Sequence, residues 1–463
     1  MTVLVVGGGI TGLVATYELV RAGAAVTLIE ATDRLGGKVR TDRVEGYLVE
    51  QGPDSFVSYR PAARMLAEEL GLGDQLIAPT QPRLVHLRRH GRMLPLPTDL
   101  GVVLPTRLRP LVTTPLFSWP QKARAGLDLL LPRRLPADDV PVGEFLRARL
   151  GRAVVEQLAD PLFGGVYGTS VDELSLDAVL PMLREHERSH RSLILASLAQ
   201  GRTARAAAAA GGRPAGSAFL SLAGGLGALV EALVAAITGA EVRLSTSVTG
   251  LTRLGPGRTG GRRTVATLSD GSRVEAEAVV LACPAPVTSR LVADELPEVA
   301  DLVAGIRHAS TGVVSLGYPL DSFASPPVGH GFLEAGPVKA VFSGCTFSSE
   351  KWPGRAEAGR VLIRAFVPNR SAALLARSDA EVFAAVEREL APVIGGSPEY
   401  RGLARWCSAM PIYAVGHRER VGRVRELAAA APEWQLAGAS YGGVGLPDCV
   451  AAGRSAATAV LAG

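Results

Sequence analysis

Three glycines near the start of the chain have a spacing that suits binding of a diphosphate. Gly7, Gly9 and Gly12 follow an apolar run over residues 2–6 and precede a stretch, 13–22, with helical apolar spacing. In a strand–turn–helix unit the first glycine permits a tight turn, the second lets the backbone approach a pyrophosphate, and the third allows close helix–strand packing. The start of such a helix also stabilises phosphate charge. The sequence therefore predicts a dinucleotide site at this glycine turn.

A carboxylate and a second glycine turn extend this site. The apolar run over 25–29 ends at Glu30, whose carboxylate can accept hydrogen bonds from a ribose hydroxyl. The segment Arg34-Leu35-Gly36-Gly37-Lys38 follows almost at once. Its glycine pair lets the chain fold back over the dinucleotide, and Arg34 is placed to help neutralise it. Because a simple NAD domain needs no second clamp, this segment favours FAD.

A third glycine-rich segment lies near the other end of the chain. Residues 436–449, LAGASYGGVGLPDC, predict a strand, a glycine turn and a helix. Such a helix can point its N-terminus at the N1–C2=O edge of a flavin, where negative charge develops on reduction. Asp448, at the helix start, is expected to be an N-terminal cap rather than a base.

These motifs require an α/β fold in which several segments share one Rossmann-type sheet. We expect a discontinuous FAD-binding domain, a mostly helical insertion and an α+β substrate domain with a mixed sheet. The expected boundaries are 1–85 for the first FAD-binding part, 86–205 for the helical insertion, 206–286 for the second FAD-binding part, 287–404 for the substrate domain and 405–463 for the third FAD-binding part.

Composition excludes several classes of protein. The 463 residues are 47% hydrophobic and 20% charged, which indicates a globular chain. The net charge of +5 is small, and no basic stripe interleaved with aromatics supports nucleic-acid binding. The four cysteines and the histidines lack metal-ligand spacing, so we expect reduced thiols and no metal. No signal peptide or apolar stretch of about 18 residues is seen, which predicts a cytoplasmic protein, soluble or peripheral.

One segment leaves two alternatives open. Residues 100–136 interleave leucines, prolines, Phe117 and Trp119 with arginines. This pattern suits a substrate channel or a membrane surface, where the protein would contact the inner face of the membrane. It equally suits a helical insertion packed on its own domain.

Beyond the glycine motif, the chain resembles the protoporphyrinogen/coproporphyrinogen oxidase family of the amine-oxidase-like flavoproteins. The resemblance runs over nearly the whole chain, in the family's order. The segments that carry it are EQGPDSF at 50–56, Arg83 with LPLPT at 94–98, LADPLFGGVYG at 158–168, FLSLAGGL at 219–226, MPIYAVGH at 410–417 and AGASYGGVGLPDC at 437–449.

The resemblance implies a non-covalent FAD and names further residues that contact it. Lys38 stands where relatives often carry arginine or tryptophan, and Asp54 stands where some carry arginine. Arg83 matches a position that pairs with a substrate propionate. The additional FAD contacts implied are Gly8, Ile10, Thr11, Ala31, Lys38, Gly52, Pro53, Asp54, Ser55, Val248, Trp406, Val444, Gly445 and Leu446.

The activity implied by the resemblance is six-electron oxidation of a porphyrinogen to a porphyrin in haem synthesis. Hydride would pass from the macrocycle to flavin N5, so no protein side chain is assigned as catalytic, and oxygen would reoxidise the flavin to yield hydrogen peroxide. The 49 basic residues include only four lysines, and this arginine- and alanine-rich composition suggests a high-GC Gram-positive source. Gram-positive members of the family oxidise coproporphyrinogen III, so the resemblance implies this compound as the first choice of substrate and protoporphyrinogen IX as the second.

Other functions share some of these features. A flavin amine oxidase or a carotenoid desaturase has the same N-terminal motifs. A flavin-bearing protein that shuttles porphyrins, or assembles with enzymes of the haem pathway without turnover, would bind FAD and porphyrin and make no peroxide. Activity assays separate these alternatives.

Overall fold

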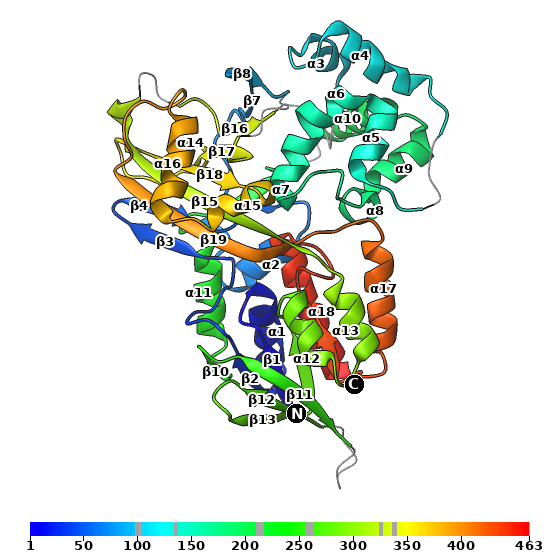
Figure 1. The fold of residues 1–463 in the computed structure, drawn as a ribbon, viewed down its shortest axis with the longest axis vertical. Coiled ribbons are helices and arrows are strands. Elements are labelled where there is room, and N and C mark those ends of the chain that lie inside the picture. Colours follow the sequence, from blue (N-terminus) through cyan, green and yellow to red (C-terminus); the bar gives the residue numbers. More distant parts are fainter. Residues whose placement is uncertain are drawn as a thin grey trace.

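The computed structural model describes residues 1–97, 100, 104, 106–133, 138–209, 217–255, 263–323, 327–335 and 340–462. In Figure 1 a layer built on a parallel sheet occupies the lower half of the molecule, and both chain termini lie at its lower end. Above it stand a second sheet and, beside that sheet, a group of helices.

The lower layer is a five-stranded parallel sheet in the order β10-β2-β1-β14-β20. Its central strand, β1 (Thr2–Val6), pairs in parallel with β2 (Ala25–Ile29) and β14 (Ala278–Leu281). The edge strands are β10 (Glu241–Arg243) and β20 (Trp434–Leu436). The three inner strands, β2, β1 and β14, are short and mainly apolar runs, as expected of a parallel sheet covered on both faces.

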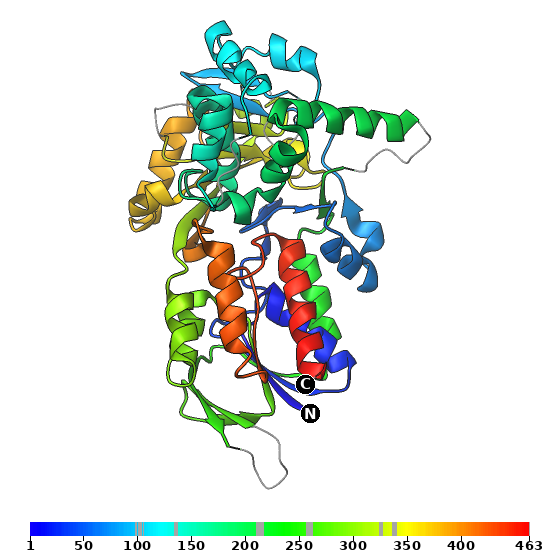
Figure 2. The same ribbon diagram turned by 90° about the vertical axis from the view of Figure 1, so that its right-hand side faces the viewer.

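Alternate residues of β1 enter two different cores. Val3 and Val5 pack with one group of helices, and Leu4 and Val6 pack with elements on the opposite face. Figure 2 shows helices of the first group side by side. That group comprises α1 (Ile10–Arg21), α2 (Ala62–Glu69), α11 (Gly227–Ala236) and α18 (Leu446–Ala462). The opposite face carries β11 (Val248–Leu254), β12 (Arg263–Leu268), β13 (Arg273–Ala276), α12 (Ala285–Val292), α13 (Pro297–Ala304) and α17 (His417–Ala428).

The upper sheet has seven strands in the order β19-β15-β18-β17-β16-β7-β8. Only the β16–β7 pair is parallel, so the sheet is mixed. Helices α15 (Ala372–Leu375) and α16 (Asp379–Leu390) cover one face. The strands are β19 (Tyr400–Pro411), β15 (His308–Pro319), β18 (Arg360–Val367), β17 (Gly344–Phe347), β16 (Gly331–Glu334), β7 (His86–Arg89) and β8 (Arg92–Pro95).

The helical part has its own buried core. Its most unusual element is η3 (Val155–Gly164), a ten-residue π-helix with Pro161 inside it. Such helices are rare, and they frequently occur at functional sites. The other helices are α3 (Leu108–Thr113), α4 (Trp119–Gly126), η2 (Leu127–Leu129), α5 (Val142–Leu150), α6 (Arg152–Val154), α7 (Gly165–Tyr167), α8 (Leu176–Val179), α9 (Pro181–His190) and α10 (Leu193–Ala209).

Short elements join these parts. They include two small sheets, β3–β4 and β5–β9–β6. Their strands are β3 (Thr41–Val44), β4 (Tyr47–Glu50), β5 (Phe56–Val57), β9 (Phe219–Leu222) and β6 (Leu76–Ile77), and the remaining helices are η1 (Gly73–Gln75), η4 (Leu320–Ser322), α14 (Ser348–Lys351) and η5 (Asn369–Ser371).

The structure departs from the expected boundaries at three places. Strands β7 and β8 fall in the range expected to be helical (86–205), yet they complete the upper sheet. The expected boundary at 404/405 falls inside β19, which pairs with β15 along most of its length. Helices α12 and α13 lie in the substrate-domain range (287–404) or at its edge, but pack on the lower sheet. The sequence of a short strand or an amphipathic helix shows which of its faces is buried, but it does not show which element packs against that face.

The surface of the helical part exposes some apolar side chains. Trp119 is 71% exposed and Leu130 is 76% exposed, and the Lys122 ammonium lies 4.7 Å from the Trp119 ring centre. Among the described helices, none has the length and apolar character needed to cross a bilayer.

Candidate active site

The start of α1 has the form of an anion site. Gly7 has a φ of +105°, and its N–H donates to Ile29 O at 2.8 Å. A Cβ on Gly12 would lie 1.9 Å from Gly7 O, so only glycine packs there. A Cβ on Gly9, in contrast, would meet no heavy atom within 4 Å. No side chain caps α1 and its first turn holds no acidic residue, so its free N–H groups suit a pyrophosphate.

Glu30 lies at the carboxyl end of β2 and faces the glycine turn. Its Oε2 accepts from Gly8 N at 2.7 Å, and its Oε1 accepts from the N–H and hydroxyl of Thr32 at 2.8 and 2.7 Å. A carboxylate has about four acceptor positions, which leaves room for a ribose hydroxyl. Thr246 N donates to Glu30 O at 3.0 Å, and this contact brings Val248 near the strand end that Glu30 and Ala31 follow.

The Gly36-Gly37 turn folds directly onto the first glycine motif. Gly36 N donates to Gly8 O at 2.8 Å, and a Cβ on Gly37 would lie 3.1 Å from the Cα of Gly9. The Arg34 guanidinium donates to Gly37 O at 2.6 Å and to Leu35 O at 3.2 Å. Arg34 therefore braces the turn, and its role as a direct FAD contact stays a prediction.

Lys38 directly follows the Gly36-Gly37 turn and lacks hydrogen-bonding and ion-pair partners within the described residues. Within the described residues its ammonium makes no hydrogen bond or ion pair that would offset burial. Burial lowers the pKa of Lys38, with Cys449 nearby. His308 is on the same side, and burial, together with the Lys38 charge, lowers its pKa. A half-buried cation without a counter-ion suits a polar or anionic ligand.

The loop from Gly52 to Ser55 presents hydrogen-bond donors. Within the described part of the chain, the N–H groups of Gly52, Asp54 and Ser55 have no acceptor. Pro53 has none to offer. The preceding carbonyl, Gln51 O, accepts from the Trp406 indole at 2.8 Å. Trp406 thus fixes the loop from β19, and the loop keeps its donors for a ligand.

The start of α18 closes the site from another side. Figure 1 shows α18 beginning beneath the upper sheet and running down to the C-terminus. Val444 and Gly445 precede it, and Leu446 is its first residue. Asp448 lies in its first turn and pairs with Arg60, whereas a Cβ on Gly445 would lie 2.8 Å from the Asp448 carboxylate. The predicted FAD contacts of this segment are therefore at a helix N-terminus.

The π-helix delivers residues that sequence reasoning missed. It leads through α7 to Tyr167 and to Gly168, whose added Cβ would lie 2.7 Å from Thr311 on β15. Burial raises the pKa of Tyr167 to about 12, and the charges of Arg60 and Asp448 act on its hydroxyl. Tyr167 therefore lies close to the start of α18. Its place in the segment LADPLFGGVYG was the available signal.

Arg83 lies beside the strand pair β5–β9, which follows loop 52–55. It sits 5.2 Å from the ring centre of Phe219, which pairs with Val57, two residues beyond Ser55. The residue is exposed, yet partial burial of the guanidinium lowers the pKa of Arg83. It has no carboxylate partner among the described residues. The arrangement fits a cation that awaits an anionic group.

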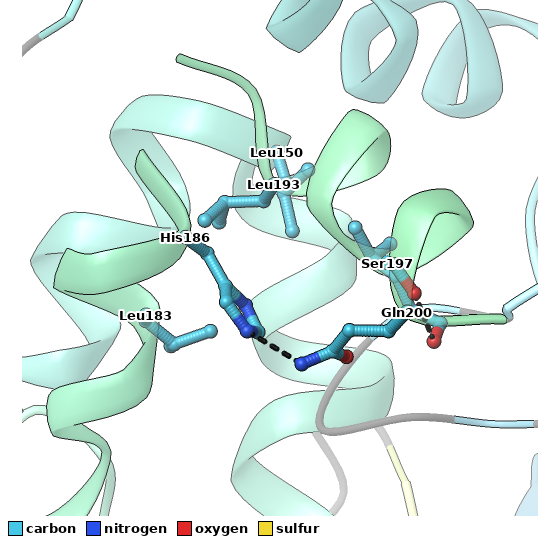
Figure 3. Close-up of a pocket in the computed structure, with 7 residues that line it drawn as sticks. Leu150, Leu183, His186, Leu193, Ser197 and Gln200 are labelled. Atoms are coloured by element: carbon cyan, nitrogen blue, oxygen red, sulfur yellow. Dashed lines mark hydrogen bonds between the residues drawn. The ribbon is translucent and has the colours of Figure 1, made fainter. Parts of the chain in front are cut away.

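Two cavities of the described structure lie away from this site. One of about 10 Å³ sits among α5, α9 and α10, where Gln200 and His186 face each other across 2.8 Å (Figure 3). Another, of about 230 Å³, opens at the amino ends of β1, β2 and β10. Parallel sheets bind ligands at the carboxyl ends of their strands, so neither cavity is the candidate site.

The predicted residues converge from separate parts of the chain. The glycine motif, Glu30, the Gly36-Gly37 turn, the 52–55 loop and the start of α18 meet where the lower sheet faces the upper one. Open space at Gly9, unused N–H donors and an uncapped helix fit a dinucleotide cofactor.

Comparisons with known proteins identify the family to which the chain belongs. The model of the family described as Flavin containing amine oxidoreductase matches residues 10–461. A coproporphyrinogen III oxidase of Propionibacterium freudenreichii subsp. freudenreichii is 48% identical over 489 residues, covering 99% of this chain and 90% of that protein. A coproporphyrinogen III oxidase of Bacillus subtilis (strain 168) is 34% identical, covering 99% of this chain and 97% of that protein.

A solved structure shares the whole fold. It is a provisionally named protoporphyrinogen oxidase from Exiguobacterium sp. 255-15, with a TM-score of 0.86, 33% identity and coverage of 99% of this chain and 98% of that one. The chain belongs to the flavin containing amine oxidoreductase family, and it is a flavin-dependent oxidoreductase. Within that family its full-length identity places it among the coproporphyrinogen III oxidases. The predicted α/β fold class is confirmed.

A buried histidine beside the site predicts a pH-dependent stability. His417 is 6% exposed and stacks on Tyr413 at 4.3 Å, and burial, aided by the Arg420 charge, lowers its pKa from 6.5 to about 4. Between these values the unfolded chain binds a proton that the folded chain does not, so stability rises with pH. We expect the free energy of unfolding to fall by about 2 kcal/mol from pH 7.5 to pH 5 through this group.

Urea unfolding at the two pH values measures this effect. His417→Phe keeps an aromatic ring against Tyr413 and should remove most of that pH dependence, whereas His190→Phe, on the surface, should retain it. Equal pH dependence in wild type and His417→Phe would contradict the assignment.

Proposed function

We propose that the protein oxidises coproporphyrinogen III to coproporphyrin III in haem synthesis, using non-covalently bound FAD and oxygen. One observation carries the proposal. N–H donors arranged to bind a dinucleotide lie near Arg83, whose guanidinium has no carboxylate partner among the described residues. The names of the two similar relatives support the choice of substrate. The reaction removes six electrons in three two-electron steps, each of which reduces one oxygen molecule to hydrogen peroxide.

The cofactor would be held by the residues predicted from the sequence. When bound, FAD accepts two electrons at a time from the substrate and passes them to oxygen. The free N–H groups at the start of α1 would bind its pyrophosphate, and Glu30 would bind a ribose. The donors of loop 52–55 and the N-terminus of α18 would hold the ring system. No side chain is assigned as an acid or base.

The substrate would be oriented by charge and by apolar contact. A porphyrinogen is a broad, mostly apolar macrocycle with anionic propionates. Arg83 would bind one propionate. Tyr59 is 72% exposed and Val166 is 60% exposed, and both neighbour the region of Tyr167. Exposed apolar groups of this kind mark ligand-binding or partner surfaces.

The test is a comparison of substrates. Purified yellow protein is mixed aerobically with coproporphyrinogen III or protoporphyrinogen IX, and porphyrin fluorescence and peroxide are followed against an enzyme-free control. Preference for coproporphyrinogen supports the proposal. Preference for protoporphyrinogen, the runner-up supported by the name of the similar solved structure, would replace it. Inactivity on both, with FAD bound, would favour an amine oxidase, a desaturase or a porphyrin carrier.

Arg83→Ala tests the contact with the substrate. Loss of a charge-assisted hydrogen bond costs about 1.5–3 kcal/mol, so we expect KM for coproporphyrinogen to rise roughly 10- to 100-fold. The flavin spectrum and FAD content should not change, because Arg83 lies outside the dinucleotide contacts. Steady-state kinetics on Arg83→Ala and on Arg423→Ala, a surface arginine of α17, provide the comparison. Loss of FAD from Arg83→Ala would show that its role is not substrate binding.

The cellular setting is part of the proposal. A cytoplasmic protein could meet the inner face of the membrane through exposed Trp119 and Leu130 next to Lys122. Enzymes that supply the porphyrinogen or use the porphyrin are further partners we propose.

A further inference from the structure

Asp54 of loop 52–55 forms a largely buried ionic cluster with Lys351 and Arg364. The Asp54 side chain is 13% exposed, and its Oδ2 accepts from Lys351 Nζ at 2.9 Å and from the Trp352 indole at 3.2 Å. Arg364 Nη1 lies 3.6 Å from the same oxygen, and the Arg364 side chain is 1% exposed. One carboxylate oxygen thus faces two cations and an indole N–H.

The carboxylate is charged despite its burial. Burial by itself would raise the pKa of Asp54, but the charges of Lys351 and Arg364 outweigh it and hold the pKa well below its usual range. Removing the Asp54 charge would leave the two cations facing each other in a poorly solvated place without the carboxylate that offsets them.

Hydrogen bonds also hold the backbone carbonyls of loop 52–55 in place. Arg364 Nη2 donates to Gly52 O at 2.5 Å, and Ser221 Oγ donates to Asp54 O at 2.7 Å. Arg364 comes from β18, in the middle of the upper sheet. With its carbonyls held from that side, the loop keeps the N–H groups of Gly52, Asp54 and Ser55 free of acceptors in the described chain.

We propose that Asp54 is a positioning residue for the flavin: with Lys351 and Arg364 it fixes the donor face of loop 52–55 and sets the electric potential there. The inference rests on the proposed function, since it takes this loop as a flavin contact. It extends that function to Lys351 of α14 and Arg364 of β18, two residues that the sequence analysis did not include.

The proposal has an electrostatic signature. Reduction adds negative charge to a flavin, so a nearby cation favours the reduced form and a nearby anion opposes it. Neutralising Asp54 should therefore shift the midpoint potential of the bound FAD to more positive values. Neutralising Lys351 should shift it to more negative values. If the cluster only stabilised the fold, the two substitutions would not shift the midpoint potential of FAD in opposite directions.

The experiment uses the purified holoenzyme and three variants: Asp54→Asn, Lys351→Gln and the double variant. The midpoint potential is measured by spectroscopic redox titration, and FAD affinity by reconstitution of apoprotein with flavin fluorescence. We expect opposite potential shifts in the single variants and a potential near wild type in the double variant. Asp54→Asn should also bind FAD roughly tenfold more weakly, about the effect of one lost hydrogen bond.

Asp128→Asn is the matched control, because Asp128 is also buried and paired with a buried arginine, Arg149, in the helical part. It should lower stability and leave the FAD potential unchanged. If Asp54→Asn does not fold, the comparison of Lys351→Gln with the double variant decides, since the added Asp54→Asn change must shift the potential upward.

Shifts of the same sign, or no shift, would overturn the proposal. Failure of wild type to oxidise coproporphyrinogen while these shifts persist would overturn the proposed substrate and leave the role of Asp54 standing.

Discussion

Gly9→Val should yield a folded protein that no longer retains FAD. Gly9 has φ −68° and ψ 176°, a conformation open to any residue, and an added Cβ meets nothing within 4 Å. The side chain would instead fill the space next to the free N–H groups of α1. Loss of two charge-assisted hydrogen bonds to a phosphate, at about 1.5–3 kcal/mol each, would weaken FAD binding more than about 100-fold.

Flavin content after purification and the FAD dissociation constant measure this effect, and the Tm of the apoprotein shows whether the fold survives. Gly250→Val is the matched control, because Gly250 on β11 also has open space at its Cβ. Gly12 should behave differently, since its added Cβ would lie 1.9 Å from Gly7 O and disturb the fold itself. Normal flavin content in Gly9→Val would mean that the pyrophosphate does not pass this glycine.

Arg149→Met is expected to cost about 3–5 kcal/mol of folding free energy. The Arg149 side chain is fully buried and pairs with Asp128 at 2.6 Å and Glu187 at 3.1 Å, both also fully buried. Its guanidinium further donates to Pro132 O at 2.8 Å and Arg191 O at 2.6 Å. Methionine fills similar volume but leaves two carboxylates without their shared cation.

Denaturant unfolding compares this variant with Arg147→Met on the same helix. Arg147 pairs with Asp172 at 2.6 Å, but both side chains are partly exposed, so its removal should cost at most about 1 kcal/mol. Similar losses in the two variants would contradict the assigned role of the buried network. FAD binding should survive in both, because α5 packs in the helical core rather than beside the glycine motif.

The sequence was most informative where a contact is local. The βαβ unit, the Gly36-Gly37 turn and the start of α18 depend on residues a few positions apart, and apolar period and glycine spacing encode them directly. The long resemblance added the 52–55 loop, Arg83 and the substrate class. The fold class and the family followed from these features alone.

The rest depended on pairings between distant segments. Strands β7 and β8 join the upper sheet because β7 pairs with β16, some 250 residues away along the chain. Lys351 meets Asp54 across 297 residues. In the sequence, Lys351 stood out only because the chain has four lysines.

By itself, then, the sequence determined a flavin-binding α/β protein of this family, since local geometry and motif chemistry are properties of short segments. Only the tertiary structure decided which cations surround Asp54 in loop 52–55 and which acids share Arg149. A buried charge has lost water as a partner and must be paired within the protein. Which residue pairs with it depends on which distant segment the folded chain places beside it.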